Sequence, residues 1–149
     1  MELLNKILEV EILLLLNFFI GSFMLSLIIV TQLVNYPLFY KVPSNVFSDY
    51  HYDYVNRISA IVVPIILMEI IISTLLFILF NSYLTMFIFT LVILIFTTTF
   101  LVQVPIHDAL KIKSDHQLFK KLIATNWIRT ALWFLKLIIS FNILLKEIT

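Results

Sequence analysis

Thirty-seven consecutive residues, from Ile70 to Ile106, carry no charged side chain. As one helix rising about 1.5 Å per residue, this stretch is too long for a single crossing of a hydrocarbon core about 30 Å thick. Asn81 and Ser82 interrupt it, and both residue types favour turns. The stretch therefore predicts two membrane-spanning helices joined by a tight turn.

The composition of the 149-residue chain points the same way. Hydrophobic residues make up 62% and charged residues 13%, with a mean hydropathy of +1.08, whereas a soluble domain is about 45–50% apolar and about 25% charged. The single Gly excludes Gly-rich phosphate loops, and the lack of Cys excludes disulfides and thiolate metal sites. No basic cluster combines with aromatic residues, so nucleic acid is not an expected partner. The lipid bilayer is the expected partner.

Spans of about 20 apolar residues are predicted at about 12–34, 58–80, 84–105 and 127–145. We therefore predict an all-α fold, an integral membrane up-down four-helix bundle forming a single domain over residues 1–149. Helical patterns continue upstream of the second and fourth spans, with Ser44 as a candidate helix cap. These two helices are expected to extend beyond the bilayer on one side.

The basic residues predict an orientation in the cell (inner) membrane, because cytoplasmic loops are enriched in Lys and Arg. The opposite side has only Lys6 and Lys146, which puts both termini outside and the two longer connections in the cytoplasm. The side of those connections carries Lys41, Arg57, Lys111, Lys113, Lys120, Lys121 and Arg129.

Two charged residues lie inside predicted spans, Glu69 in the second and Lys136 in the fourth. Both spans start from the same side, so the two charges should reach similar depths near the midplane. Each charge costs about 2.5–3.5 kcal/mol of insertion free energy at that depth. We therefore expect the two charges to pair, because pairing lowers this cost. The pair is either a salt bridge that fixes helix register or a catalytic proton-transfer or ligand-binding pair.

The histidines suggest a second kind of site. His51 precedes the second span and His107 follows the third, so both belong to the same end of the bundle. Two imidazoles with a nearby carboxylate (Asp49, Asp53 or Asp108) suit a transition metal, and two axial imidazoles suit a haem. A hydrogen-bonded interfacial histidine is the simpler interpretation of each.

The start of the fourth helix carries Asn126, Arg129, Thr130 and Trp133 on one face, at about 100° per residue. These residues could grip an anionic or carbonyl-bearing ligand, or Arg129 could meet lipid phosphates while the two Trp form an interfacial belt. On the first helix, Asn17, Gly21, Gln32 and Asn35 share the face expected to be turned into the bundle.

Polar residues thus gather at one end of the predicted bundle. Tyr36 and Gln103 are the candidates there for holding a cofactor, and His107, Asn126 and Arg129 are candidate catalytic residues. This asymmetry predicts a site that opens at that end and leads down to Glu69.

Several short motifs resemble a family of small four-helix bacterial membrane proteins, and the similarity runs over most of the chain. The motifs are Asn35-Tyr36-Pro37, Asp49-Tyr50-His51, Arg57-Ile58, Glu69, Val104-Pro105-Ile106-His107 and Thr125-Asn126-Trp127-Ile128-Arg129-Thr130. More remotely, the Val-Pro near the end of the third helix and the Asn-Trp-x-Arg opening of the fourth are similar to anthrone-oxygenase-like membrane proteins. That resemblance implies oxidation of a lipophilic, often aromatic, substrate, and His107, Asn126 and Arg129 are the positions that carry over.

Three hypotheses follow for the function. The first is a membrane-embedded enzyme, oxidoreductase- or oxygenase-like, whose lipophilic small-molecule substrate enters from the bilayer. The second is a non-catalytic accessory or assembly subunit of a membrane complex. The third is a small transporter; four helices without an inverted repeat are few for a transporter, and a homo-oligomer could supply more.

Overall fold

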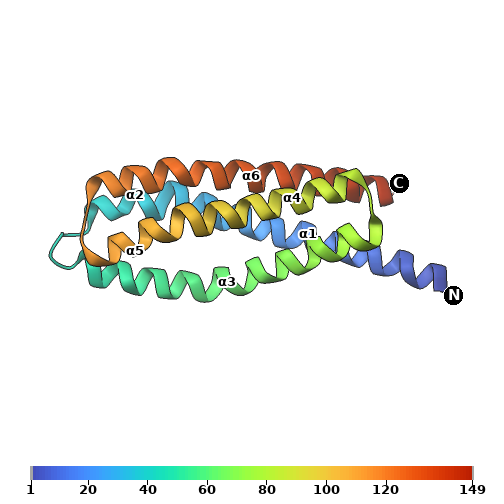
Figure 1. The fold of residues 1–149 in the computed structure, drawn as a ribbon, viewed down its shortest axis with the longest axis horizontal. Helices are drawn as coiled ribbons and strands as arrows, with labels where there is room; N and C mark the ends of the chain where they lie inside the picture. The colour runs from blue at the N-terminus through green and yellow to red at the C-terminus, as the bar shows by residue number, and fades with distance from the viewer. Residues whose placement is uncertain (1, 149) are drawn as a thin grey trace.

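The computed structural model describes residues 2–148, with side chains described for residues 10–146. Four long helical columns run alternately up and down, which places both termini at one end and the connections 42–46 and 113–115 at the other (Figure 1). The columns are built from α1 (Glu2–Val30), η1 (Thr31–Asn35), α2 (Tyr36–Leu38), η2 (Phe39–Lys41), α3 (Phe47–Phe80), α4 (Tyr83–Thr98), η3 (Thr99–Gln103), α5 (Val104–Ile112) and α6 (His116–Ile148). The all-α four-helix bundle is confirmed, and each column is long and apolar enough to cross a membrane.

All four columns, and not only the second and fourth, extend beyond the predicted spans at the end with the connections. The first column continues to Lys41 and the third to Ile112, so the predicted stops near 34 and 105 mark no helix ends. Both pass through a proline, Pro37 or Pro105, that follows a π-helical turn. In η1 the N–H of Tyr36 donates to the carbonyl of Thr31, and in η3 the N–H of Val104 donates to that of Thr99. These wider turns accommodate the proline ring, which would otherwise clash with the preceding turn.

The turn at Asn81 and Ser82 is where the uncharged stretch predicted it. Asn81 ends α3 in the left-handed conformation (φ 40°), which Asn tolerates better than most residues. Ser82 then opens α4 with a capping box, in which its hydroxyl accepts from the N–H of Thr85. The expectation for Ser44 was wrong, because α3 begins after Val46 without a side-chain cap.

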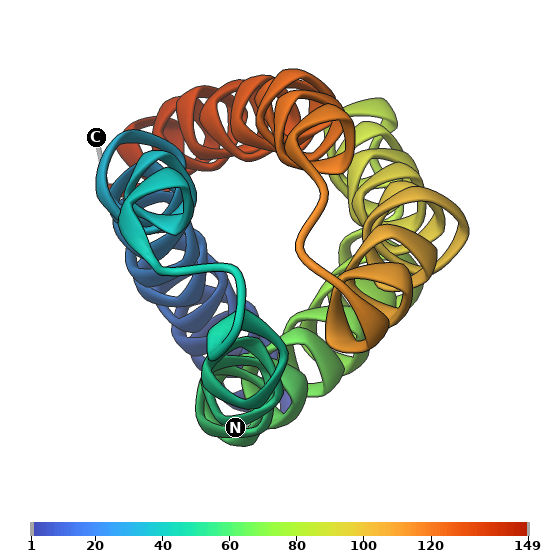
Figure 2. The ribbon, with the colours of Figure 1, turned by 90° about the vertical axis from the view of Figure 1, so that its left-hand side faces the viewer.

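The columns pack in a ring, in the order α1, α3, α4 and α6 and back to α1 (Figure 2). Three apolar layers fill its interior along the axis. The layer at the termini is centred on Leu14, Leu76 and Ile88, and the middle layer on Met24, Ile95 and Trp133. The layer at the connections is aromatic, built from residues such as Phe39, Phe47 and Phe119. Large exposed apolar side chains cover the outer surface of the columns, as lipid contact requires.

Candidate functional site

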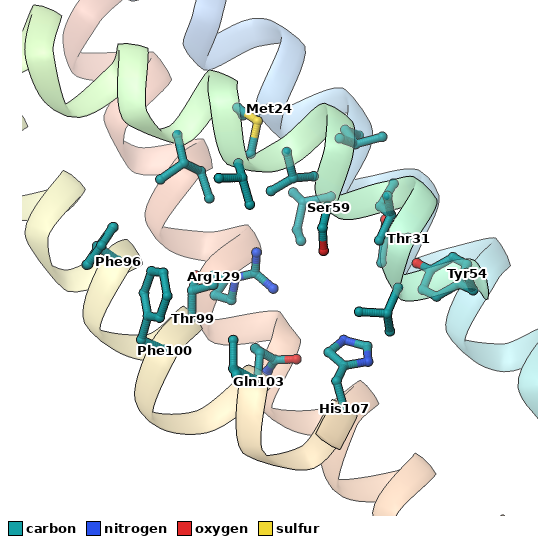
Figure 3. A pocket seen from close by; sticks show the side chains of 18 of the residues that line it. Met24, Thr31, Tyr54, Ser59, Phe96, Thr99, Phe100, Gln103, His107 and Arg129 are labelled. Carbon is teal, nitrogen blue, oxygen red and sulfur yellow. The ribbon is translucent and has the colours of Figure 1, made fainter. Parts of the chain in front are cut away.

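A cavity of about 310 Å³ lies between the middle layer and the aromatic layer. This volume is at the lower end of the roughly 300–1,000 Å³ typical of small-molecule sites. Every column contributes to its wall, and side chains from α3, η3 and α6 face one another across it (Figure 3).

The lining changes character along the bundle axis. Toward the connections it is polar, with Tyr36, Tyr54, Gln103, His107 and Arg129 as the main contributors. Toward the middle layer it is apolar, and its wall there is built from Met24, Ile28, Ile66, Leu67 and Phe96. The site therefore matches an amphipathic molecule that lies along the helices.

One side of the cavity is open to the outer surface. Val63 and Leu67 on α3, and Phe100 and Val104 on η3 and α5, line the cavity and are also exposed. Within each pair the residues are four apart, so each pair forms one ridge on its helix. The opening thus runs between these two apolar ridges, on the surface that would face lipid.

Arg129 is the one charged side chain in the wall that is buried, with 6% of its surface exposed. Its Nη1 donates to Asn126 Oδ1 at 3.1 Å, and its guanidinium lies 5.2 Å from the centre of the Trp133 ring. It also interacts with the Tyr36 hydroxyl. No carboxylate among the described side chains lies within ion-pair distance, and its Nε has no partner.

Asn126 holds Arg129 in place rather than lining the cavity. Its Nδ2 donates to Gln32 Oε1 at 2.7 Å, while Gln32 Nε2 donates to the carbonyl of Ile123 at 3.1 Å. All three polar side chains are buried, so the network fixes the guanidinium relative to η1 and α6. The predicted grouping of Asn126 with Arg129 is confirmed, and Gln32 is an addition that the sequence did not suggest for this site.

His51 and His107 meet, as their positions at one end of the bundle suggested. His107 Nδ1 lies 3.1 Å from His51 Nε2, and His107 Nε2 lies 3.1 Å from the Tyr36 hydroxyl. Both nitrogens of His107 are thus engaged, while His51 Nδ1 is buried without a partner. Tyr36, His107 and His51 therefore form one hydrogen-bonded row, in which the histidine tautomers decide which atom donates.

The carboxylates expected to complete a metal site do not join these histidines. Asp49 and Asp53 are exposed, and Asp108 pairs with Lys111 at 2.8 Å. Among the described residues no three His, Cys, Asp or Glu side chains gather as a metal site would need. A haem or transition metal held by His51 and His107 stays a prediction.

Glu69 and Lys136 form a fully buried ion pair, with Nζ 2.8 Å from Oε1. The pairing predicted from their depths is confirmed. The two residues come from α3 and α6, which face each other across the ring, and Trp133 Nε1 completes the cluster by donating to both Glu69 oxygens at 3.2 and 3.1 Å. Gly21 provides the space, because a Cβ there would lie 3.2 Å from Lys136 Nζ.

The candidate residues therefore divide into two groups. Tyr36, Gln103, His107 and Arg129 line the cavity, whereas Glu69 and Lys136 lie deeper and outside its lining. The prediction that the site leads down to Glu69 was therefore wrong. Trp133 connects the groups, since it stacks on Arg129 and donates to Glu69. Of the two tryptophans assigned to an interfacial belt, Trp127 is half exposed but Trp133 is buried, so the belt interpretation was wrong for Trp133. Trp133 lies on the same helix face as Arg129 and Lys136, and this spacing in the sequence could have indicated that Trp133 is buried.

Comparisons of the chain with protein-family models, with curated proteins and with solved structures gave no match.

Proposed function

We propose that this chain is an integral membrane protein whose cavity takes a lipophilic molecule with an anionic or carbonyl group from the bilayer. The observation that carries the proposal is Arg129, a buried guanidinium at the wall of an apolar cavity without a carboxylate partner. An unpaired buried charge is costly, and a charged side chain inside a membrane segment marks a functional site more often than not. A ligand that accepts hydrogen bonds from Arg129 removes that cost.

The charge balance of the interior supports an anion over a neutral carbonyl. Among the side chains described for residues 10–146, the buried acidic and basic groups other than histidine are Glu69, Lys136 and Arg129, which is one carboxylate against two cations. Glu69 is already paired with Lys136. One negative charge is therefore lacking, and a singly charged ligand beside Arg129 would supply it.

The surface of the protein indicates the route by which the ligand enters and the orientation of the protein in the membrane. The side opening between α3 and η3 is apolar on both edges, which favours a ligand that arrives laterally from lipid. Arg129 is buried and does not count for orientation, yet the end with the connections still carries most of the basic residues. We therefore propose that the connections are cytoplasmic and that the cavity lies in the cytoplasmic half of the cell membrane.

Oxidation of the bound ligand is the reaction that the resemblance to anthrone-oxygenase-like proteins implies. In that case His107 would act on the ligand as an acid–base group and Arg129 would bind it, while Asn126 would act through Arg129. We assign the Glu69–Lys136 pair a structural role, because it is enclosed by Trp133 and Gly21 and does not line the cavity.

Ligand-dependent thermal stability in detergent tests the binding proposal. A ligand that binds only the folded state raises the melting temperature, so myristate should raise it in the wild type, methyl myristate, which has a neutral carbonyl, should raise it less, and myristylamine should not raise it. Arg129→Gln should greatly reduce the rise, measured against the variant's own ligand-free melting temperature, because the variant also loses the bond to Asn126 and the contact with Trp133. Equal stabilisation of wild type and Arg129→Gln by myristate would overturn the proposal.

A further inference from the structure

We infer that the ligand is a single-chain amphiphile whose head group carries a hydrogen-bond donor, such as a hydroxyl, next to its carboxylate. The inference rests on the proposed function and adds the chemistry of the head group and the shape of the tail. Two buried polar atoms at the polar end of the cavity carry it, Arg129 Nε and Gln103 Oε1, neither of which has a partner among the side chains described for residues 10–146.

The orientation of the Gln103 amide is fixed by its neighbours. Gln103 Nε2 lies 2.8 Å from Thr125 Oγ1, which itself donates to the carbonyl of Lys121 at 2.7 Å. A hydroxyl has one proton, so Thr125 must accept from Gln103, and the atom that faces it has to be the amide nitrogen. The amide oxygen is then left free, and it points toward the cavity (Figure 3).

The free acceptor Gln103 Oε1 and the free donor Arg129 Nε together define which head group the ligand needs. Gln103 is 2% exposed and Arg129 6%, and a buried polar group without a hydrogen bond carries a desolvation cost. A carboxylate alone would satisfy Arg129 but leave Gln103 Oε1 facing an anion. A carboxylate with an adjacent hydroxyl satisfies both, because the hydroxyl donates to Gln103 while the carboxylate accepts from Arg129.

The shape of the cavity favours a chain over a compact ring system. A sphere of 310 Å³ would be about 8 Å across. The lining residues on the third column run instead from Phe96 to Lys111, about 22 Å at 1.5 Å per residue. The head lies near Gln103 and Arg129. The apolar part of the wall from Gln103 to Phe96, about 10 Å at 1.5 Å per residue, takes the first part of the tail toward the middle layer.

The test compares α-hydroxymyristate, whose hydroxyl is on the carbon next to the carboxylate, with myristate, using calorimetric titration of the detergent-solubilised full chain. Wild type should bind the hydroxy acid about tenfold more tightly, the ratio expected when one buried acceptor gains its hydrogen bond. In Gln103→Leu, which lacks the acceptor, the two acids should bind equally. Gln117→Leu, a change at an exposed position of α6, is the matched control and should keep the wild-type preference.

The possible outcomes separate this inference from the proposal on which it rests. If wild type binds both acids with the same affinity, the head-group inference is overturned while the binding proposal stands. If it binds neither, the binding proposal fails as well. The wild-type comparison alone decides, so the inference is testable even if Gln103→Leu does not fold. Persistence of the preference in a folded Gln103→Leu would also refute the role of Gln103.

Discussion

The Glu69–Lys136 pair allows a quantitative test of what holds the bundle together. We consider Glu69→Gln, Lys136→Met and the double variant. Both side chains are buried, their charged atoms are 2.8 Å apart, and they link α3 to α6 across the centre of the ring. Each single change removes one charge and leaves the other enclosed.

The expected cost of each single change is about 3–5 kcal/mol of unfolding free energy, the range for an uncompensated buried charge. After Lys136→Met, Glu69 keeps only the N–H of Trp133. After Glu69→Gln, Lys136 has no counter-ion, because Glu69 is its one ion-pair partner among the described residues. The double variant removes both charges, and such replacements are often neutral or stabilising. We therefore expect it to be more stable than either single variant.

Equilibrium unfolding in mixed SDS micelles, followed by circular dichroism, measures these free energies. The control is Lys146→Met, which changes an exposed lysine of α6, the helix that contains Lys136. Its unfolding free energy should stay within about 0.5 kcal/mol of that of the wild type. Single variants within 1 kcal/mol of wild type would refute the structural role of the pair. So would a double variant whose loss equals the sum of the two single losses, because the residues would then not be coupled.

Three further predictions concern neighbouring parts of the fold. Gly21→Ala should destabilise the protein by about 1–3 kcal/mol in the same unfolding assay, the opposite of the usual gain for Gly→Ala in a helix. Its Cβ would lie 3.2 Å from Lys136 Nζ, so the loss should shrink in the shorter Lys136→Met background. Ser82→Ala should cost about 1 kcal/mol, because α4 loses the capping bond from Thr85, whereas an unchanged stability would contradict the capping role. Asn126→Ala should weaken myristate binding about tenfold in calorimetry, since Arg129 loses its acceptor, and an unchanged affinity would refute its positioning role.

The sequence predicted the bundle and the ion pair because both follow from the cost of polarity in lipid. Absence of charge marked the helical hairpin and its turn at Asn81 and Ser82, which the structure contains. Two charges at equal depth predicted the pairing of Glu69 with Lys136. The gathering of polar residues at one end included four that line the cavity, Tyr36, Gln103, His107 and Arg129, whereas His51 and Asn126 of the same end do not line it.

Other features depend on packing that no pattern in the sequence encodes. The predicted spans end near 34 and 105, before Pro37 and at Pro105, yet a π-helical turn before each proline lets the column continue. The donation from Trp133 to Glu69 depends on side chains meeting across the ring. Similarly, the free oxygen of Gln103 follows from a bond to Thr125 on another helix, and no spacing within η3 could reveal it.

The most direct test of the proposed function is the dissociation constant of myristate for wild type, Arg129→Gln and Arg129→Lys, measured by calorimetry in one detergent. If the ligand's negative charge meets Arg129, Arg129→Gln should bind at least about tenfold more weakly, because a charge-assisted hydrogen bond is lost. Arg129→Lys keeps the charge and should retain part of the affinity. Equal dissociation constants for all three proteins would contradict the account.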